Sequence, residues 1–246
     1  MKKKIGVQLY SVRNELGKDF DGVIAKIAEM GYDGIELAGL PAGVTPEKAV
    51  KLFKSLGLGL SGAHMALPVG ENKNKIIDDA KALGITTIIG GKGPNDFKTA
   101  DLVKKSCEIF NEAANAAKDA GLRVAIHNHW WEFGKIDGRL VFDMMLEQLD
   151  PCVFFEVDTY WVKTGGSDPV SIVKSLGKRA PLLHIKDGPC VQGQPMLAAG
   201  KGAMDFPSIL KVADHAEWLV VELDECATDM LEAVKGSLVY LKKIVK

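Results

Sequence analysis

Four pairs of polar residues interrupt apolar, β-branched stretches in the second half of the sequence. The pairs are His127 and His129, Glu156 and Asp158, His184 and Lys186, and Glu222 and Asp224. The members of each pair are two residues apart, and residues at that spacing in a β-strand point to the same face of the sheet. Burying so many ionisable groups in separate places would cost free energy at each place through desolvation. We therefore expect the four pairs to share one site.

Histidine and carboxylate side chains at such a site suit a divalent cation, because imidazole nitrogens and carboxylate oxygens are common metal ligands. Each pair taken alone has a simpler interpretation, since a histidine or aspartate at a strand end often caps or hydrogen-bonds to the backbone. Four successive pairs favour a metal that ligands from adjacent strands can reach together. A mixture of imidazoles and carboxylates is compatible with Mn²⁺, Zn²⁺, Co²⁺ or Mg²⁺. We expect no organic cofactor.

The elements that must position these pairs can be predicted from the hydrophobic pattern. Longer segments with apolar residues three and four positions apart are typical of amphipathic helices, and they end at a glycine. Thr45, Asp168 and Asp205 stand where helices should begin. Short apolar runs predict eight strands, which are "KIGVQLYS", "GIELAG", "LGLSGAHMAL", "TTIIGG", "RVAIHNH", "VFFEVDTYW", "LLHIKD" and "WLVVELDE".

Eight strand and helix units without a Pro- or Ser-rich linker indicate a single domain with one parallel sheet. We predict an α/β fold, a (β/α)₈ TIM barrel that spans residues 1–246, because eight units favour closure over an open sheet. The alternative is a doubly wound open sheet, but the first strand is not followed by the GxGxxG turn of a dinucleotide site. In a TIM barrel the four polar pairs lie toward the C-terminal mouth, where barrel enzymes place their active sites.

Composition points to a small-molecule partner. The formal net charge is -1 and the lysines are scattered, so we expect neither a nucleic-acid nor a membrane partner. The four cysteines form no CxxC pair, which indicates reduced thiols and a cytoplasmic location. The start "MKKKIGVQLYSV" is interrupted by Gln8 and Arg13 too early for a secretory signal, although a leader removed beforehand stays open. A homo-oligomer is also left open.

Several phrases resemble a known family along nearly the whole chain. "GYDGIELAG", "HNHWWEF", "VDTYW", "LLHIKDG" and "VVELDE" are similar to the sugar phosphate isomerase/epimerase family of xylose isomerase-like TIM barrels. That family is related to inosose dehydratases and hydroxypyruvate isomerases. Its members typically hold a divalent metal with Glu, Asp, His and Glu from strands five to eight. The resemblance implies His127, Asp158, His184 and Glu222 as the ligands here, with His127 at the position where many relatives have glutamate.

The resemblance implies a metal-dependent isomerase or epimerase that moves a proton next to the carbonyl of a ketose or keto sugar. Glu222 is the expected proton acceptor, with His129 or Lys186 as the acid. A histidine ligand in place of glutamate disfavours epimerisation by two bases. One-base isomerisation stays open, as does a lyase or dehydratase that eliminates from a 3-keto glycoside or an inosose-like substrate. A non-catalytic sugar-binding barrel is the third alternative.

Other residues near the expected mouth are candidates for contact with the sugar. Glu36 and His64 lie at the ends of the second and third predicted strands. They could reach a polyol, or they could have a structural role only. Trp131 and Trp161 follow the ligand strands and could stack on a sugar ring or pack as a lid. The glycine-rich loop "GPCVQGQPMLAAGKGAMDF" holds Lys201 but no arginine. Recognition of a phosphate group is therefore not expected.

Overall fold

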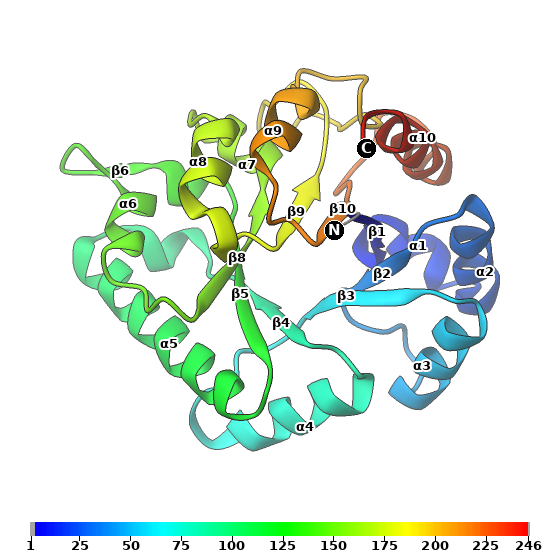
Figure 1. Cartoon of the computed structure of the whole chain (residues 1–246), viewed down its shortest axis with the longest axis horizontal. Coiled ribbons are helices and arrows are strands. Elements are labelled where there is room, and N and C mark those ends of the chain that lie inside the picture. The colour runs from blue at the N-terminus through cyan, green and yellow to red at the C-terminus, as the bar shows by residue number, and fades with distance from the viewer. Residues whose placement is uncertain (1–2, 246) are drawn as a thin grey trace.

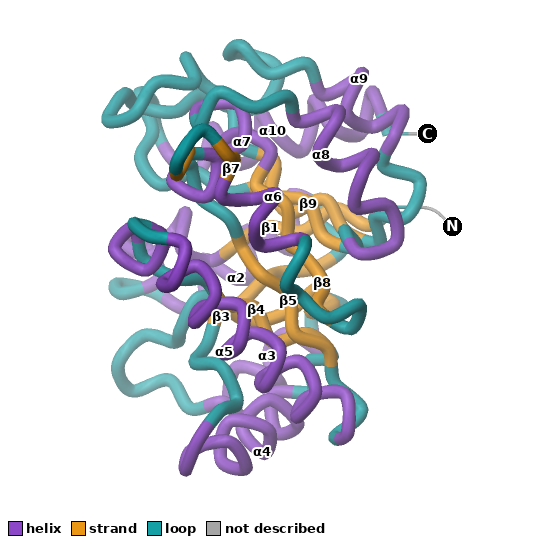
Figure 2. The backbone as a smooth tube through the Cα atoms, turned by 90° about the vertical axis from the view of Figure 1, so that its left-hand side faces the viewer, coloured by secondary structure: helices purple, strands orange, loops and turns teal. Residues whose placement is uncertain are grey.

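The computed structural model describes residues 3–245, and its centre is a closed barrel of parallel strands. Neighbouring strands follow the order β1-β10-β9-β8-β5-β4-β3-β2, and the predicted eight-stranded TIM barrel is confirmed. Figures 1 and 2 show the strands enclosed by the helices. The barrel strands are β1 (Lys4–Gln8), β2 (Gly34–Leu37), β3 (Gly59–His64), β4 (Thr87–Gly90), β5 (Arg123–His127), β8 (Val153–Asp158), β9 (Leu182–Ile185) and β10 (Trp218–Val221).

Helices follow the strands and bury their apolar faces against the outside of the barrel. The predicted helix starts are confirmed, since the side chains of Thr45, Asp168 and Asp205 each accept hydrogen bonds from backbone N–H groups of the first turn. The α-helices are α1 (Arg13–Leu16), α2 (Phe20–Met30), α3 (Pro46–Ser55), α4 (Lys73–Leu83), α5 (Ala100–Asp119), α6 (Val141–Leu146), α7 (Thr159–Thr164), α8 (Pro169–Leu176), α9 (Phe206–Val212) and α10 (Met230–Ile244).

The interior of the barrel is apolar at its N-terminal end. The Trp218 ring lies across this end, over the backbones of Gly6, Gly34 and Gly59. A methyl group at Gly34 would come within 2.7 Å of the ring, so only glycine allows the indole to lie there. Together with its apolar neighbours, Trp218 forms the floor of the barrel. Those neighbours are Ile89, Ala125, Phe154, Leu182 and Val220.

Strand register places the polar pairs above this floor. His127 pairs with Glu156 between β5 and β8, and Asp158 pairs with His184 between β8 and β9. Side chains at matching positions of adjacent parallel strands lie side by side on one face. The inward face therefore carries the polar residues of neighbouring strands at similar heights, which is how residues far apart in sequence come together.

A long loop connects β9 to α9 and is organised around one buried carboxylate. Asp187 accepts hydrogen bonds from the backbone N–H groups of Gly188, Gly200, Gly202 and Met204, at 2.8 to 3.1 Å. Outside the barrel, β6 (Lys135–Ile136) and β7 (Arg139–Leu140) form a small antiparallel hairpin. In residues 3–245, no helix has both the length and the apolar character that crossing a membrane would need. All four cysteines are free thiols.

Candidate active site

A cavity of about 530 Å³ opens at the C-terminal mouth of the barrel. Its walls come from the ends of seven of the eight strands or from the residues just after them, which matches the expected position of the polar pairs. The lining residues are Gln8, Tyr10, Ala38, Gly39, His64, Gly91, His127, His129, Lys186, Glu222 and Asp224.

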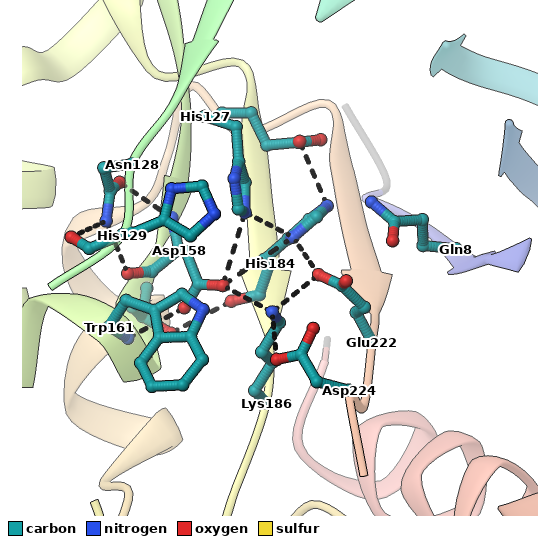
Figure 3. A network of polar contacts seen from close by, with 12 residues as sticks. Gln8, His127, Asn128, His129, Asp158, Trp161, His184, Lys186, Glu222 and Asp224 are labelled. Atoms are coloured by element: carbon teal, nitrogen blue, oxygen red, sulfur yellow. Dashed lines mark hydrogen bonds and ion pairs between the residues drawn. The ribbon is translucent and has the colours of Figure 1, made fainter. Parts of the chain in front are cut away.

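Four of the predicted ligands converge at the base of this cavity, and we call them the upper cluster. His184 Nδ1 lies 2.7 Å from Glu222 Oε2 and 3.1 Å from His127 Nε2. Asp158 Oδ2 lies 3.4 Å from His127 Nε2 and 3.8 Å from His184 Nδ1. These four atoms all lie within 4.8 Å of one another, and the side chains point toward a common centre (Figure 3).

Asp158 is fixed in place by its neighbours. Asn128, at the end of β5, donates a hydrogen bond to the Asp158 carbonyl and accepts one from the Asp158 N–H. The Asp158 Oδ1 atom accepts a hydrogen bond from the Trp161 N–H at the start of α7. One carboxylate oxygen therefore caps the helix, while the other is left to face the centre of the cluster.

Lys186 introduces a positive charge beside the upper cluster. Its Nζ atom lies 2.8 Å from Glu222 Oε2, 3.1 Å from Asp158 Oδ2 and 3.0 Å from Asp224 Oδ2. The contact with Asp224 is a hydrogen bond. Glu222 Oε2 and Asp158 Oδ2 are buried and, within residues 3–245, are close to Lys186 but receive no hydrogen bond of good geometry. Both oxygens are thus available to a further cation.

The charges in the site hold its carboxylates in the ionised form. Burial opposes ionisation of Glu222, but Lys186 and His184 lower its pKa below its usual value. Burial also opposes ionisation of Asp158, but Lys186 together with His127 lowers its pKa well below the usual range. The surrounding carboxylates raise the pKa of Lys186 despite its burial.

The two histidines at the end of β5 are held in the neutral form. Burial lowers the pKa of His127 to about 3, against a hydrogen bond with Asp158 that raises it, and the neighbouring histidines His184, His64 and His129 add to the lowering. Burial and the Lys186 charge lower the pKa of His129 to about 4. A neutral imidazole keeps a lone pair for a metal or a substrate hydroxyl.

The residues of the upper cluster fit a divalent cation. Two imidazole nitrogens and two carboxylate oxygens are the donors that Zn²⁺, Mn²⁺ and Co²⁺ accept. The carboxylate oxygens of Asp158 and Glu222 that face the centre are buried and lack hydrogen bonds in the described part of the chain. Buried anionic oxygens in that state are stabilised by a positive ion. His127, Asp158, His184 and Glu222 would hold it.

A second group of ionisable side chains lies deeper in the barrel, and we call it the lower cluster. It consists of Glu36, His64, Glu156 and His184, so that His184 belongs to both clusters. Sequence reasoning placed Glu156 on the same face as Asp158 but gave it no role, and it gave Gln8 none. The two-residue spacing from Asp158 was the available signal for Glu156.

The predicted substrate-contact residues lie at different depths. His64 lines the cavity, but Glu36 is fully buried beneath it. Trp131 stacks on His129 with ring centroids 4.1 Å apart and donates its indole N–H to the Lys92 carbonyl. Trp161 lies under the Lys186 ammonium, 5.2 Å from its ring centroid. Neither indole is among the lining residues of the cavity within the described chain.

Comparisons with known proteins agree with this architecture. The profile of the family described as xylose isomerase-like TIM barrel matches residues 24–244. A comparison with curated proteins found no match. The solved structure of a sugar phosphate isomerase/epimerase from Parabacteroides distasonis is 30% identical and has a TM-score of 0.83; the match covers 99% of this chain and 100% of that one.

Two further solved structures are similar in fold. A D-allulose 3-epimerase from Methylomonas sp., in complex with D-allulose, is 18% identical with a TM-score of 0.73, over 99% of this chain and 97% of that one. An IOLI protein with a bound zinc atom is 14% identical with a TM-score of 0.75, over 98% of both chains. At sequence identities this low, the similarity to these two structures shows a shared fold alone.

Proposed function

Because the chain belongs to the xylose isomerase-like TIM barrel family, we propose that it is a divalent-metal-dependent sugar isomerase. It takes a proton from the carbon next to the carbonyl of a ketose or keto sugar and returns it to the former carbonyl carbon. The observation that carries this proposal is the convergence of two imidazoles and two carboxylates at the base of a solvent-open cavity, beside the Lys186 ammonium.

The metal site consists of His127, Asp158, His184 and Glu222. A divalent cation held there would polarise a substrate carbonyl and its neighbouring hydroxyl and so acidify the C–H bond next to the carbonyl. Glu222 takes the proton, because it lines the cavity and its carboxylate is kept ionised by Lys186 and His184. Lys186 stabilises the negative charge that develops on the substrate oxygen.

A single base acting on one side of the substrate is favoured over two opposed bases. Glu222 and Asp224 line the cavity and both follow β10, so the two carboxylates stand on the same wall. At the C-terminal end of β5 and just after it, the wall presents His127 and His129, whose neutral imidazoles are weak proton shuttles. Transfer between adjacent carbons on one face needs one base, whereas epimerisation by inversion needs an acceptor and a donor on opposite faces.

The substrate class is a free sugar. His129 hydrogen-bonds a sugar hydroxyl as a neutral imidazole, held in position by its stacking on Trp131. Lys186, the lysine that lines the cavity, is already paired with three carboxylates and is a weak partner for a phosphate dianion. The D-allulose bound to the Methylomonas epimerase is a ketose of this class.

A lyase working at the same centre is the second candidate. The observation that favours it is the protonated Lys186 beside the base Glu222, since elimination needs one group to accept the C–H proton and another to donate to the leaving oxygen. Its substrate would be a 3-keto glycoside or an inosose-like compound. A non-catalytic sugar-binding barrel is the third candidate and requires no proton transfer.

One experiment separates the three candidates. The protein is stripped with a chelator, reloaded with Mn²⁺, Co²⁺ or Zn²⁺, and incubated in D₂O with a panel of ketoses and 3-keto glycosides. Metal-dependent deuterium incorporation with an isomerised product is the expected result, read by NMR. An unsaturated sugar would identify the lyase. Saturable binding without exchange on any sugar would contradict both reactions.

A further inference from the structure

We propose that the lower cluster is a second cation site, distinct from the upper one, in which Glu36, His64, Glu156 and His184 bind a zinc-like divalent ion. This inference goes beyond the proposed reaction and does not depend on it. The site lies between the catalytic cavity and the Trp218 floor of the barrel, and it holds the ion for structural purposes.

The four donor atoms have the separations of a closed metal site. His64 Nε2 lies 3.2 Å from Glu36 Oε1 and 2.8 Å from Glu156 Oε2. His184 Nε2 lies 2.9 and 3.1 Å from the same two oxygens. Ligands bound tetrahedrally about 2.0–2.1 Å from a zinc ion are about 3.3 Å apart. Small outward movements would therefore admit the ion.

With both carboxylates ionised, hydrogen bonds do not satisfy this arrangement. Both histidine Nε2 atoms would have to carry a proton, because ionised carboxylate oxygens only accept. His64 Nε2 also lies 3.0 Å from Gln8 Nε2, an amide that donates to Glu36 Oε1. Two N–H groups at that distance repel each other. Turning the amide over would instead bring its oxygen against the Glu36 oxygen. While Glu36 and Glu156 are both ionised, either orientation therefore leaves a conflict.

A bound cation removes this conflict. His64 then uses the lone pair of Nε2 for the ion and needs no proton there, while Gln8 still donates to Glu36. Glu156 supplies a second observation, because its side chain is fully buried and Oε1 has no hydrogen-bond partner among residues 3–245. Such an oxygen is free to turn toward an ion.

The donor set indicates the class of cation. Four protein ligands with two imidazoles and two carboxylates match a closed, structural zinc site better than Mg²⁺, which keeps several waters. His184 presents Nε2 to this ion and Nδ1 to the upper cluster. When both sites are filled, its ring would bridge the two ions without an N–H, so both protons of the charged imidazole are released.

The test is metal stoichiometry. Chelator-stripped protein is titrated with Zn²⁺, desalted, and the bound ions are counted by elemental analysis and native mass spectrometry. Wild type should hold two ions per chain. Glu156→Gln removes a ligand from the lower cluster alone, so this variant should hold one ion. Asp158→Asn removes a ligand from the upper cluster alone and should also hold one ion. Glu132→Gln alters a buried glutamate outside both clusters and should hold two.

The outcomes distinguish this site from the proposed function. A single ion that is lost in Asp158→Asn and kept in Glu156→Gln would overturn the second site and leave the upper one intact. A single ion with the opposite pattern would support the second site and contradict the metal role in the proposed reaction. If Glu156→Gln fails to fold, His64→Gln at the partly exposed ligand replaces it. A second ion that survives loss of His64 or Glu156 lies elsewhere and overturns the inference.

Discussion

The Lys186 ammonium lies 2.8 Å from Glu222 Oε2, with both side chains buried at the base of the cavity. An ammonium so close to a carboxylate favours the ionised form of both groups, which is why the pKa of Glu222 falls and that of Lys186 rises. Lys186, which also lines the cavity, therefore keeps the proposed base Glu222 in its ionised form.

Removing the charge of Lys186 should impair the base as well as the transition state. In Lys186→Met the pKa of Glu222 rises, so the acid limb of the pH profile of kcat/KM should move to higher pH. The rate at its optimum should fall by about 10²-fold or more, as for loss of one charged transition-state contact. Lys186→Arg keeps the charge and should keep the acid limb. An unchanged limb in Lys186→Met would contradict the coupling.

Replacement of the proposed base should separate catalysis from folding. Glu222→Gln keeps the shape of the side chain but cannot accept a proton, so kcat should fall by about 10²- to 10⁴-fold. The variant should still fold, as measured by circular dichroism and thermal melting. A Glu222→Gln enzyme with full activity on the sugar that wild type converts would rule out this assignment.

The identity of residue 127 should set the metal preference of the upper cluster. His127→Glu exchanges a nitrogen donor for an oxygen donor, which disfavours Zn²⁺ and favours harder ions such as Mn²⁺ and Mg²⁺. The ratio of the dissociation constants for Mn²⁺ and Zn²⁺ should fall by at least about tenfold, measured by competition calorimetry. His127→Gln is the matched control, and an unchanged ratio in His127→Glu would place His127 outside the metal site.

The carboxylate of Asp187 should determine the order of the loop between β9 and α9. Asp187→Asn removes one acceptor oxygen from a group that four backbone N–H donors share, and each charged hydrogen bond contributes about 1.5–3 kcal/mol. We expect a loss of about 2–4 kcal/mol in unfolding free energy and faster proteolysis within residues 188–204. Asp205→Asn at an exposed helix cap should change stability little.

Glu132 should make stability depend on pH. Burial raises its pKa to about 8, although its carboxylate accepts a hydrogen bond from the His129 N–H. In the unfolded chain its pKa is about 4.3. Between these values the folded protein binds the extra proton, so the free energy of unfolding falls as pH rises toward 8, by up to about 1.4 kcal/mol per unit.

Glu132→Gln removes this titration. Urea unfolding of both proteins at pH 5, 6, 7 and 8 should show the variant gaining stability relative to wild type as pH rises. A constant difference across the series would mean that Glu132 is already ionised in the folded protein.

The barrel and the shared location of the polar pairs could be predicted from short-range rules, whereas the choice of the four upper-cluster residues among those pairs depended on the family resemblance. The two-residue period puts Asp158 and His184 on the inward face of their strands, and parallel register then sets them side by side. The substitution of His127 for glutamate did not disturb this geometry, since position on the strand and not residue type places the side chain.

The lower cluster could not be predicted because it forms across the interior of the barrel. His64 on β3 meets Glu156 on β8, and these strands are separated by β4 and β5. A register shift between β2 and β3 at Glu36 also changes which residues of β3 lie level with it. The orientation of Trp131 depends on a loop and on the Lys92 carbonyl, which no periodic pattern encodes.

The indole of Trp218 closes the barrel opposite its mouth, where it packs against the backbones of Gly6, Gly34 and Gly59. Within residues 3–245 the indole therefore separates the cavity from the N-terminal end of the barrel. In the proposed reaction, sugar and product would both pass through the C-terminal mouth, beside Tyr10 and Gly39.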